Sequence, residues 1–140
     1  MQRDRPFAPY IQRLRDAGLR PTRQRIALAR LLFGGADRHV TAERLHDEAR
    51  HAGIKVSLAT VYNALHQFTS AGLLREVVVD PSRAYFDTNT GPHHHFFDEA
   101  SGELTDLPAD AVDLGGLPEP PEGARISGVD VIIRIEKSEA

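Results

Sequence analysis

The chain has 140 residues, of which 41% are hydrophobic, so it can bury one ordinary core or two small ones. It contains no cysteine, which excludes disulfides, thiolate zinc sites and iron–sulfur clusters. Any metal must therefore be bound through nitrogen and oxygen. No run of eighteen apolar residues and no secretory signal is visible, so we expect a cytoplasmic protein without a membrane span.

The charges are unevenly distributed. The net charge is −3, but residues 1–86 contain 14 Lys and Arg against 8 Asp and Glu, whereas residues 87–140 contain 3 against 12. The basic residues of the first part are nearly all arginine, which suits contacts to phosphates and to guanine. This asymmetry favours nucleic-acid binding by the first part only.

The first part is predicted to form four helices. Apolar residues recur at helical spacing from Phe7 to Leu14, and that helix is expected to end at Gly18. The next three helices are predicted to follow Thr or Ser N-caps and to end at glycines; the caps are Thr22, Thr41 and Ser57, and the glycines are Gly34, Gly53 and Gly72. A β-branched run to Val79, a turn at residues 80–83 and a strand at residues 84–86 then predict a hairpin. Residues 1–86 thus resemble a winged helix-turn-helix.

The second part has short strands. Phe96 and Phe97 lie in one strand, Ser101-Gly102 in a turn, and residues 103–107 in the returning strand. A short helix is expected from Pro108, and a loop at residues 115–123. Residues 129–135 alternate as a strand. We therefore expect an α+β protein: a winged helix, a hinge at residues 87–92, and a small α/β dimerisation domain at residues 93–140 with a three-stranded antiparallel sheet. A sheet this small leaves one face to cover, which predicts a homodimer.

The fourth predicted helix is the candidate for reading DNA. Its polar face presents Thr60, Tyr62, Asn63 and His66 away from the apolar stripe, as a recognition helix does in the major groove. Further contacts to phosphate are expected from arginines before and at the start of the second helix and at the tip of the hairpin, namely Arg20, Arg23, Arg25 and Arg83. A solvated helix face is the competing interpretation.

Three consecutive histidines follow Pro92. In a strand, His93 and His95 share one face and His94 points to the other, so two separate sites are predicted. Oxygen ligands are available from Asp87 and Asp106 on the first face, and from Asp113 on the second. His39 could connect the DNA-binding part to the metal. These donors suit Fe²⁺, Mn²⁺ or Zn²⁺; a histidine cluster without a physiological ligand is the alternative.

Three blocks of sequence resemble the ferric uptake regulator family. They are Gly18–Arg25, His39–Glu43 and Leu58–Tyr62, and the resemblance extends from about Leu14 to Ile135. It implies a homodimeric repressor in which metal at the hinge sets the DNA-competent arrangement. It also implies that the hinge site falls on His39, Asp87, His93, His95 and Asp106, and that a second site falls on His94 and Asp113.

The chain departs from this family at several positions. Two hinge positions have Asp where Glu is usual, and Val129 replaces the remaining histidine of the second site, which is therefore incomplete. Asp98 and Ser101 stand where the family has cysteines, so no structural zinc site is expected. Asn63 replaces an arginine of the recognition helix, which implies a different operator.

The histidine triplet without cysteine is similar to the iron response regulator branch. That similarity implies control of iron and haem genes, with haem bound through His93, His94 or His95. The expected partners are a second copy of the chain, in a homodimer, and double-stranded DNA with an A·T-rich inverted repeat. Two alternatives remain open: a constitutive DNA-binding dimer with inert histidines, and a mononuclear metal hydrolase, for which no nucleophile or phosphate-binding loop is present.

Overall fold

The computed structural model describes residues 6–137, and the chain divides into two compact units between Thr90 and Gly91. This division falls within residues 87–92, the range predicted as a hinge. Among the described residues, no helix is long and apolar enough to span a membrane.

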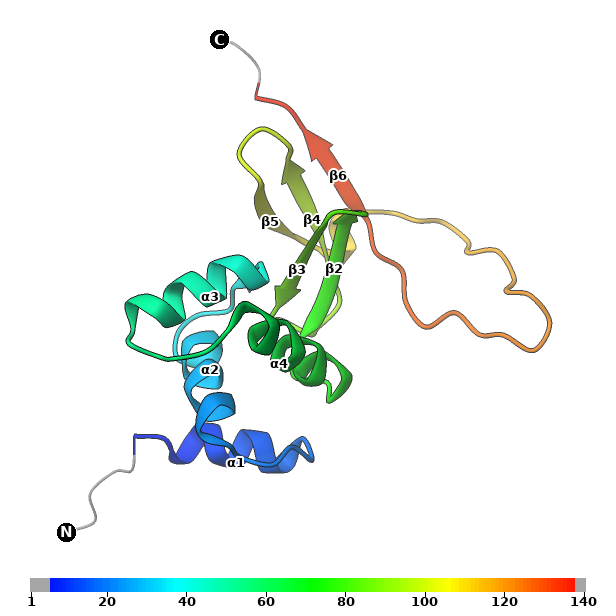
Figure 1. The fold of residues 1–140 in the computed structure, drawn as a ribbon. Coiled ribbons are helices and arrows are strands. Elements are labelled where there is room, and N and C mark those ends of the chain that lie inside the picture. Colours follow the sequence, from blue (N-terminus) through cyan, green and yellow to red (C-terminus); the bar gives the residue numbers. More distant parts are fainter. Residues whose placement is uncertain (1–5, 138–140) are drawn as a thin grey trace. The chain divides into compact units, whose positions relative to one another are not determined.

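The first unit is a winged helix (Figure 1). Its elements are α1 (Ala8–Asp16), α2 (Arg23–Phe33), β1 (His39–Val40), α3 (Ala42–His51), α4 (Leu58–Ser70), β2 (Arg75–Asp80) and β3 (Arg83–Asp87). The three strands form an antiparallel sheet in the order β1-β3-β2. The expected helices and hairpin are confirmed, whereas β1 was not predicted because two residues are too few for a periodic pattern.

Side-chain caps fix where three of the helices begin. The hydroxyls of Thr22, Thr41 and Ser57 accept hydrogen bonds from the backbone N–H groups three residues later, at 3.2, 3.1 and 3.1 Å. Each bond satisfies a helix N–H group that has no partner within the helix. At the other end of α4, Gly72 has a φ of +83°, a conformation that glycine adopts without steric cost. The candidate DNA-reading helix α4 is thus bounded by local chemistry at both ends.

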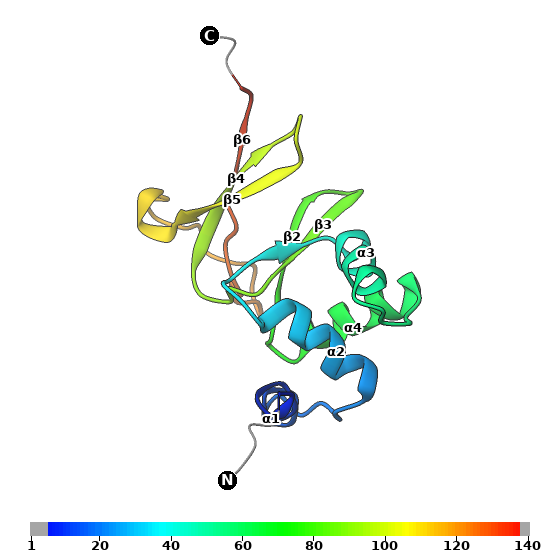
Figure 2. The ribbon, with the colours of Figure 1, turned by 90° about the vertical axis from the view of Figure 1, so that its left-hand side faces the viewer.

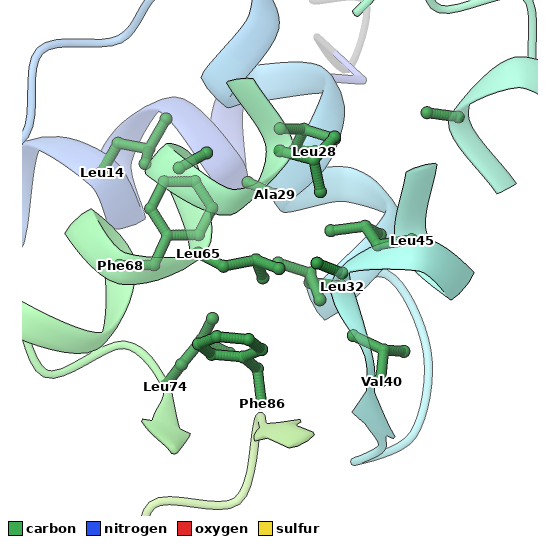
Figure 3. Packing of buried hydrophobic residues seen from close by; sticks show 14 residues of the cluster. Leu14, Leu28, Ala29, Leu32, Val40, Leu45, Leu65, Phe68, Leu74 and Phe86 are labelled. Atoms are coloured by element: carbon green, nitrogen blue, oxygen red, sulfur yellow. The ribbon is translucent and has the colours of Figure 1, made fainter. Parts of the chain in front are cut away.

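The hydrophobic core of the first unit joins all four helices to the sheet (Figure 3). Leu65 and Phe68 of α4 pack with Leu28 of α2, Leu45 of α3 and Phe86 of β3, and all five are at most 1% exposed. The predicted apolar stripe of α4 therefore faces the core. Its polar side chains are left on the surface, where they are available to a ligand.

The second unit is built on a three-stranded sheet in the order β5-β4-β6 (Figure 2). Its elements are β4 (His93–Asp98), β5 (Glu103–Pro108), a 3₁₀ helix η1 (Ala109–Ala111) and β6 (Ile132–Ile135). Residues 112–131 connect η1 to β6 without regular structure (Figure 1). The expected strands and short helix are present, although the last strand is shorter than residues 129–135.

One strand pairing differs from the prediction. Strands β4 and β5 are antiparallel, but β6 pairs in parallel with β4, so the sheet is mixed and not antiparallel throughout. The β4–β5 hairpin returns the chain to the end of the sheet where β4 begins. The long connection then enters β6 from that same end, and β6 consequently runs in the direction of β4. The alternation of apolar residues carried no information on strand direction.

Candidate metal centre and nucleic-acid interface

His39 and Asp87 form a pair of candidate ligands within the first unit. They lie directly opposite each other where β1 pairs with β3, and their ligand atoms are within 4.8 Å. Asp87 is 1% exposed, and its Oδ1 accepts a hydrogen bond from the backbone N–H of Asn89 at 2.9 Å. Burial of a carboxylate is costly unless charge or hydrogen bonds compensate it, so this position suits a cation ligand.

A second group of candidate ligands lies in the sheet of the second unit. Asp106 of β5 is in register with His95 of β4, and its Oδ1 lies 3.5 Å from Nε2 of His95 and 3.7 Å from Nε2 of His93. The two imidazole rings are 4.5 Å apart between centroids. Both histidines are at most 5% exposed. The predicted common face of His93 and His95 is thus present, with the carboxylate beside it.

The hydrogen bond to Gly91 determines which nitrogen of His93 can bind a metal. Its Nδ1 lies 2.7 Å from the carbonyl oxygen of Gly91. A carbonyl only accepts, so Nδ1 donates a proton to it, and Nε2 on the side of Asp106 is the nitrogen that could bind a metal. This arrangement of an imidazole oriented by a backbone carbonyl is usual for metal-binding histidines. The residues therefore fit a divalent cation bound by nitrogen and oxygen.

His94 has a different role in the sheet. Its Nδ1 accepts a hydrogen bond from the backbone N–H of Val131 at 3.2 Å, just before β6. A neutral imidazole that accepts at Nδ1 carries its proton on Nε2, so the ring is occupied in joining β4 to the C-terminal segment. Asp113, its predicted partner, accepts a hydrogen bond from the N–H of Gly115 at 2.9 Å. The second site on His94 and Asp113 therefore stays a prediction, with Nε2 of His94 as the nitrogen left to bind a ligand.

The exposed face of α4 contains the predicted DNA-reading residues. Tyr62, Asn63 and His66 are exposed, whereas Thr60 is half-buried and its hydroxyl lies 2.9 Å from that of Ser57. The ring of Tyr62 stacks on that of His66. Its hydroxyl donates to Oε1 of Glu43 at 2.6 Å, and this hydrogen bond raises the pKa of the phenol. Tyr62 is therefore neutral and held by α3.

The candidate DNA-binding arginines differ in exposure and in the hydrogen bonds that their guanidinium groups form. Arg20 and Arg23 are exposed beside the start of α2. The guanidinium of Arg25 donates to the carbonyl oxygen of Arg20 at 2.9 Å and to Oε1 of Gln67 at 2.8 Å. Arg25 thus connects the start of α2 to the reading helix, which is a structural contact that the sequence did not indicate.

Arg83 is paired within the β2–β3 hairpin, which is the wing of the winged helix. Its guanidinium donates to Oδ2 of Asp80 at 2.9 and 2.8 Å, while the hydroxyl and N–H of Ser82 donate to Oδ1. The predicted turn is therefore closed by a carboxylate. The predicted site did not include Glu43 and Gln67, because their contacts join elements far apart in the sequence. Asp80 was predicted only as part of the turn and not as a partner of Arg83.

Comparisons with known proteins show which proteins the chain is similar to. Residues 16–115 match the ferric uptake regulator family. The "Peroxide-responsive repressor PerR" of Staphylococcus epidermidis is 34% identical over 104 residues, which are 74% of this chain and 69% of that protein. The ferric uptake regulator from Pseudomonas aeruginosa with manganese is 26% identical, with a TM-score of 0.68 over 93% of this chain and 98% of that one. The Vibrio cholerae ferric uptake regulator is 23% identical, with a TM-score of 0.72 over 91% and 98%.

Proposed function

Because the chain belongs to the ferric uptake regulator family, we propose that it is a DNA-binding dimer whose affinity for its operators depends on a metal ion bound by residues of both units. Family membership makes it a transcriptional regulator and removes the hydrolase alternative. The constitutive DNA-binding dimer remains the competing function.

The division of the candidate ligands between the two units is the observation that supports this proposal. His39 and Asp87 belong to the unit that contains α4, and His93, His95 and Asp106 belong to the other. An ion that takes ligands from both units favours one arrangement of the DNA-binding units over the others. A structural ion would need no ligand from the DNA-binding unit.

The donor set defines the class of metal. Imidazole nitrogens and carboxylate oxygens suit Fe²⁺ and Mn²⁺, and also Zn²⁺ in vitro. The manganese of the Pseudomonas aeruginosa relative supports this choice. Aspartate stands at both carboxylate positions, Asp87 and Asp106, and its side chain is one methylene shorter than that of glutamate.

The proposed DNA interface consists of α4, the start of α2 and the wing. We expect Tyr62, Asn63 and His66 to contact base edges and Arg20 and Arg23 to contact phosphates. Two-fold symmetry of a homodimer would match an inverted repeat. The proposed dimer contact is the sheet face with Ile133 and Ile135, which are 37% and 39% exposed.

DNA binding as a function of metal tests the proposal. An operator is first selected from a random duplex pool with Mn²⁺-loaded protein, and its fluorescence anisotropy is then titrated with metal-free and Mn²⁺-loaded protein. We expect Mn²⁺ to increase the affinity of the wild type for the operator and to leave the affinity of His39→Ala unchanged. His51→Ala is the matched control, because His51 is exposed on α3 and bonds only within its own helix, to the carbonyl of Asp47. Tight binding that ignores Mn²⁺ would establish the constitutive dimer instead.

The physiological signal is the finer part of the proposal. Iron or haem is favoured by the histidine triplet, and peroxide by the name of the Staphylococcus epidermidis relative. The same titration is repeated with haem and, separately, with hydrogen peroxide added to Fe²⁺-loaded protein. The compound that releases the DNA identifies the signal. If haem binds through His94, His94→Ala reduces the Soret shift of added haem; an unchanged shift contradicts that assignment.

A further inference from the structure

Arg38 immediately precedes the candidate ligand His39 and forms a two-pronged ion pair with α3. Its Nη1 donates to Oε1 of Glu48 at 2.8 Å, and its Nη2 donates to Oε2 at 2.6 Å. The two side chains are 31% and 25% exposed. Parallel bonds of this kind fix orientation as well as distance. The bond from Arg38 lowers the pKa of Glu48, and that to Glu48 raises the pKa of Arg38, so both are charged in the neutral range.

The backbone of Arg38 is fixed as well. Its N–H donates to the hydroxyl of Thr88 at 2.8 Å, and its carbonyl accepts from the N–H of Thr88 at 2.9 Å. Thr88 follows Asp87 directly. Each candidate ligand, His39 or Asp87, is therefore next in sequence to one member of the Arg38–Thr88 pair, which two backbone hydrogen bonds join. Nη1 of Arg38 also donates to the carbonyl of Leu31 in the last turn of α2, at 3.3 Å.

These contacts limit the freedom of His39 before any ligand is bound. The peptide between Arg38 and His39 is fixed by Thr88 on one side, while the guanidinium is fixed by two helices. From this geometry we infer that the Arg38–Glu48 pair positions His39 opposite Asp87, so that metal affinity depends on a residue that never contacts the metal. The inference rests on the proposed function, since it takes His39 and Asp87 as ligands. Residues that orient ligands in this way typically change metal affinity about 10- to 100-fold when they are replaced.

A comparison of two arginines that share one carboxylate tests this inference. Arg44 also donates to Oε2 of Glu48, at 3.1 Å, but its side chain is 71% exposed and lies on α3 itself. We expect Arg38→Met to weaken Mn²⁺ binding about ten-fold and Arg44→Met to leave it unchanged. Arg38→Lys keeps the charge without the two-pronged geometry and is expected to lie between the wild type and Arg38→Met.

Mn²⁺ affinity is measured from the electron paramagnetic resonance signal of free Mn²⁺, with urea unfolding of each metal-free variant as a separate readout. If Arg38→Met does not fold, Glu48→Gln breaks the same ion pair and is expected to weaken Mn²⁺ binding. Wild-type affinity in Arg38→Met, or an equal loss in Arg44→Met, would overturn the inference. A wild type that binds no Mn²⁺, or binds it as tightly as His39→Ala does, would instead overturn the proposed function.

Discussion

The two units of the chain differ in the balance of hydrophobic and polar side chains that they bury. The first unit gathers fourteen hydrophobic residues into one buried cluster. In the described part of the second unit, Phe97 and Leu104 are buried hydrophobics, together with the polar His93, His94, His95 and Asp98. Its large apolar residues at Leu114, Leu117, Ile126, Ile133 and Ile135 are exposed. The first unit therefore derives its stability from its own core, whereas the second relies on polar contacts and on apolar surface that a partner can cover.

The distribution of charge follows the same division. Arginine dominates the first part of the sequence, and acidic residues dominate the second. Helix packing leaves the arginines and the polar face of α4 on the surface, where phosphate can be reached. A self-sufficient core allows this unit to present a rigid surface to DNA. In the proposed function, ligand binding by the second unit would then require no change within α4.

The largest effect should come from the core of the first unit. Phe68 is 0% exposed and belongs to a cluster that contains residues of all four helices of the first unit. Phe68→Ala is therefore expected to reduce the free energy of unfolding by about 3–5 kcal/mol. Urea unfolding followed by circular dichroism measures this loss. Phe7→Ala is the matched control, because Phe7 is 41% exposed and its loss should cost only about 0.5 kcal/mol. Equal losses for the two variants would contradict the conclusion that the first unit derives its stability from its buried core.

An intermediate effect is expected at the sheet of the second unit. Ile133 of β6 lies in register with Phe96 and is 37% exposed, so a dimer contact can bury only that remaining part of its surface. Ile133→Ser should therefore weaken the proposed dimer by about 0.5–1 kcal/mol for each buried copy. Sedimentation equilibrium over a range of concentrations measures the dissociation constant. Val78→Ser removes an equally β-branched exposed residue from β2 and is expected to leave the constant unchanged. A dimer that tolerates Ile133→Ser would place the contact elsewhere.

Local chemistry made much of the fold predictable. The hydroxyls of Thr22, Thr41 and Ser57 cap the helices that the sequence placed after them, because a cap depends on residues only three positions apart. The hairpin turn at residues 80–83 is local in the same sense. The alternation of His93, His94 and His95 across β4 also follows from strand geometry alone.

Contacts between distant residues could not be read from the sequence. The pairing of β1 with β3, which sets His39 opposite Asp87, joins positions far apart and involves only two residues of β1. The parallel direction of β6 depends on where the long connection re-enters the sheet. For the same reason the contact of Arg25 with Gln67, 42 positions away, was not predicted. Residue type identifies the candidate ligands, but tertiary contacts decide which of them are oriented.

The smallest effect concerns the wing, where a surface contact is independent of either core. Hydrogen bonds from Ser82 and Arg83 lower the pKa of Asp80 to about 2, from an ordinary value of 3.8. Because the pKa is lowered in the folded state, the stabilisation is present above the ordinary value and is lost as the pH falls through about 2. Asp80 should thus remain mostly ionised at pH 3, where an ordinary aspartate is mostly protonated. An NMR titration of its side-chain carboxyl carbon measures this directly.

Two variants of the turn sharpen this test. Ser82→Ala and Arg83→Gln each remove a donor to the carboxylate, so each should raise the pKa of Asp80 towards its ordinary value, with the larger rise for Ser82→Ala. Ile133→Ser should leave that pKa unchanged, because the turn is closed by residues 80–83 alone. If the pKa follows the oligomeric state instead, the wing is not independent of the second unit, and the first unit is less self-sufficient than its core indicates.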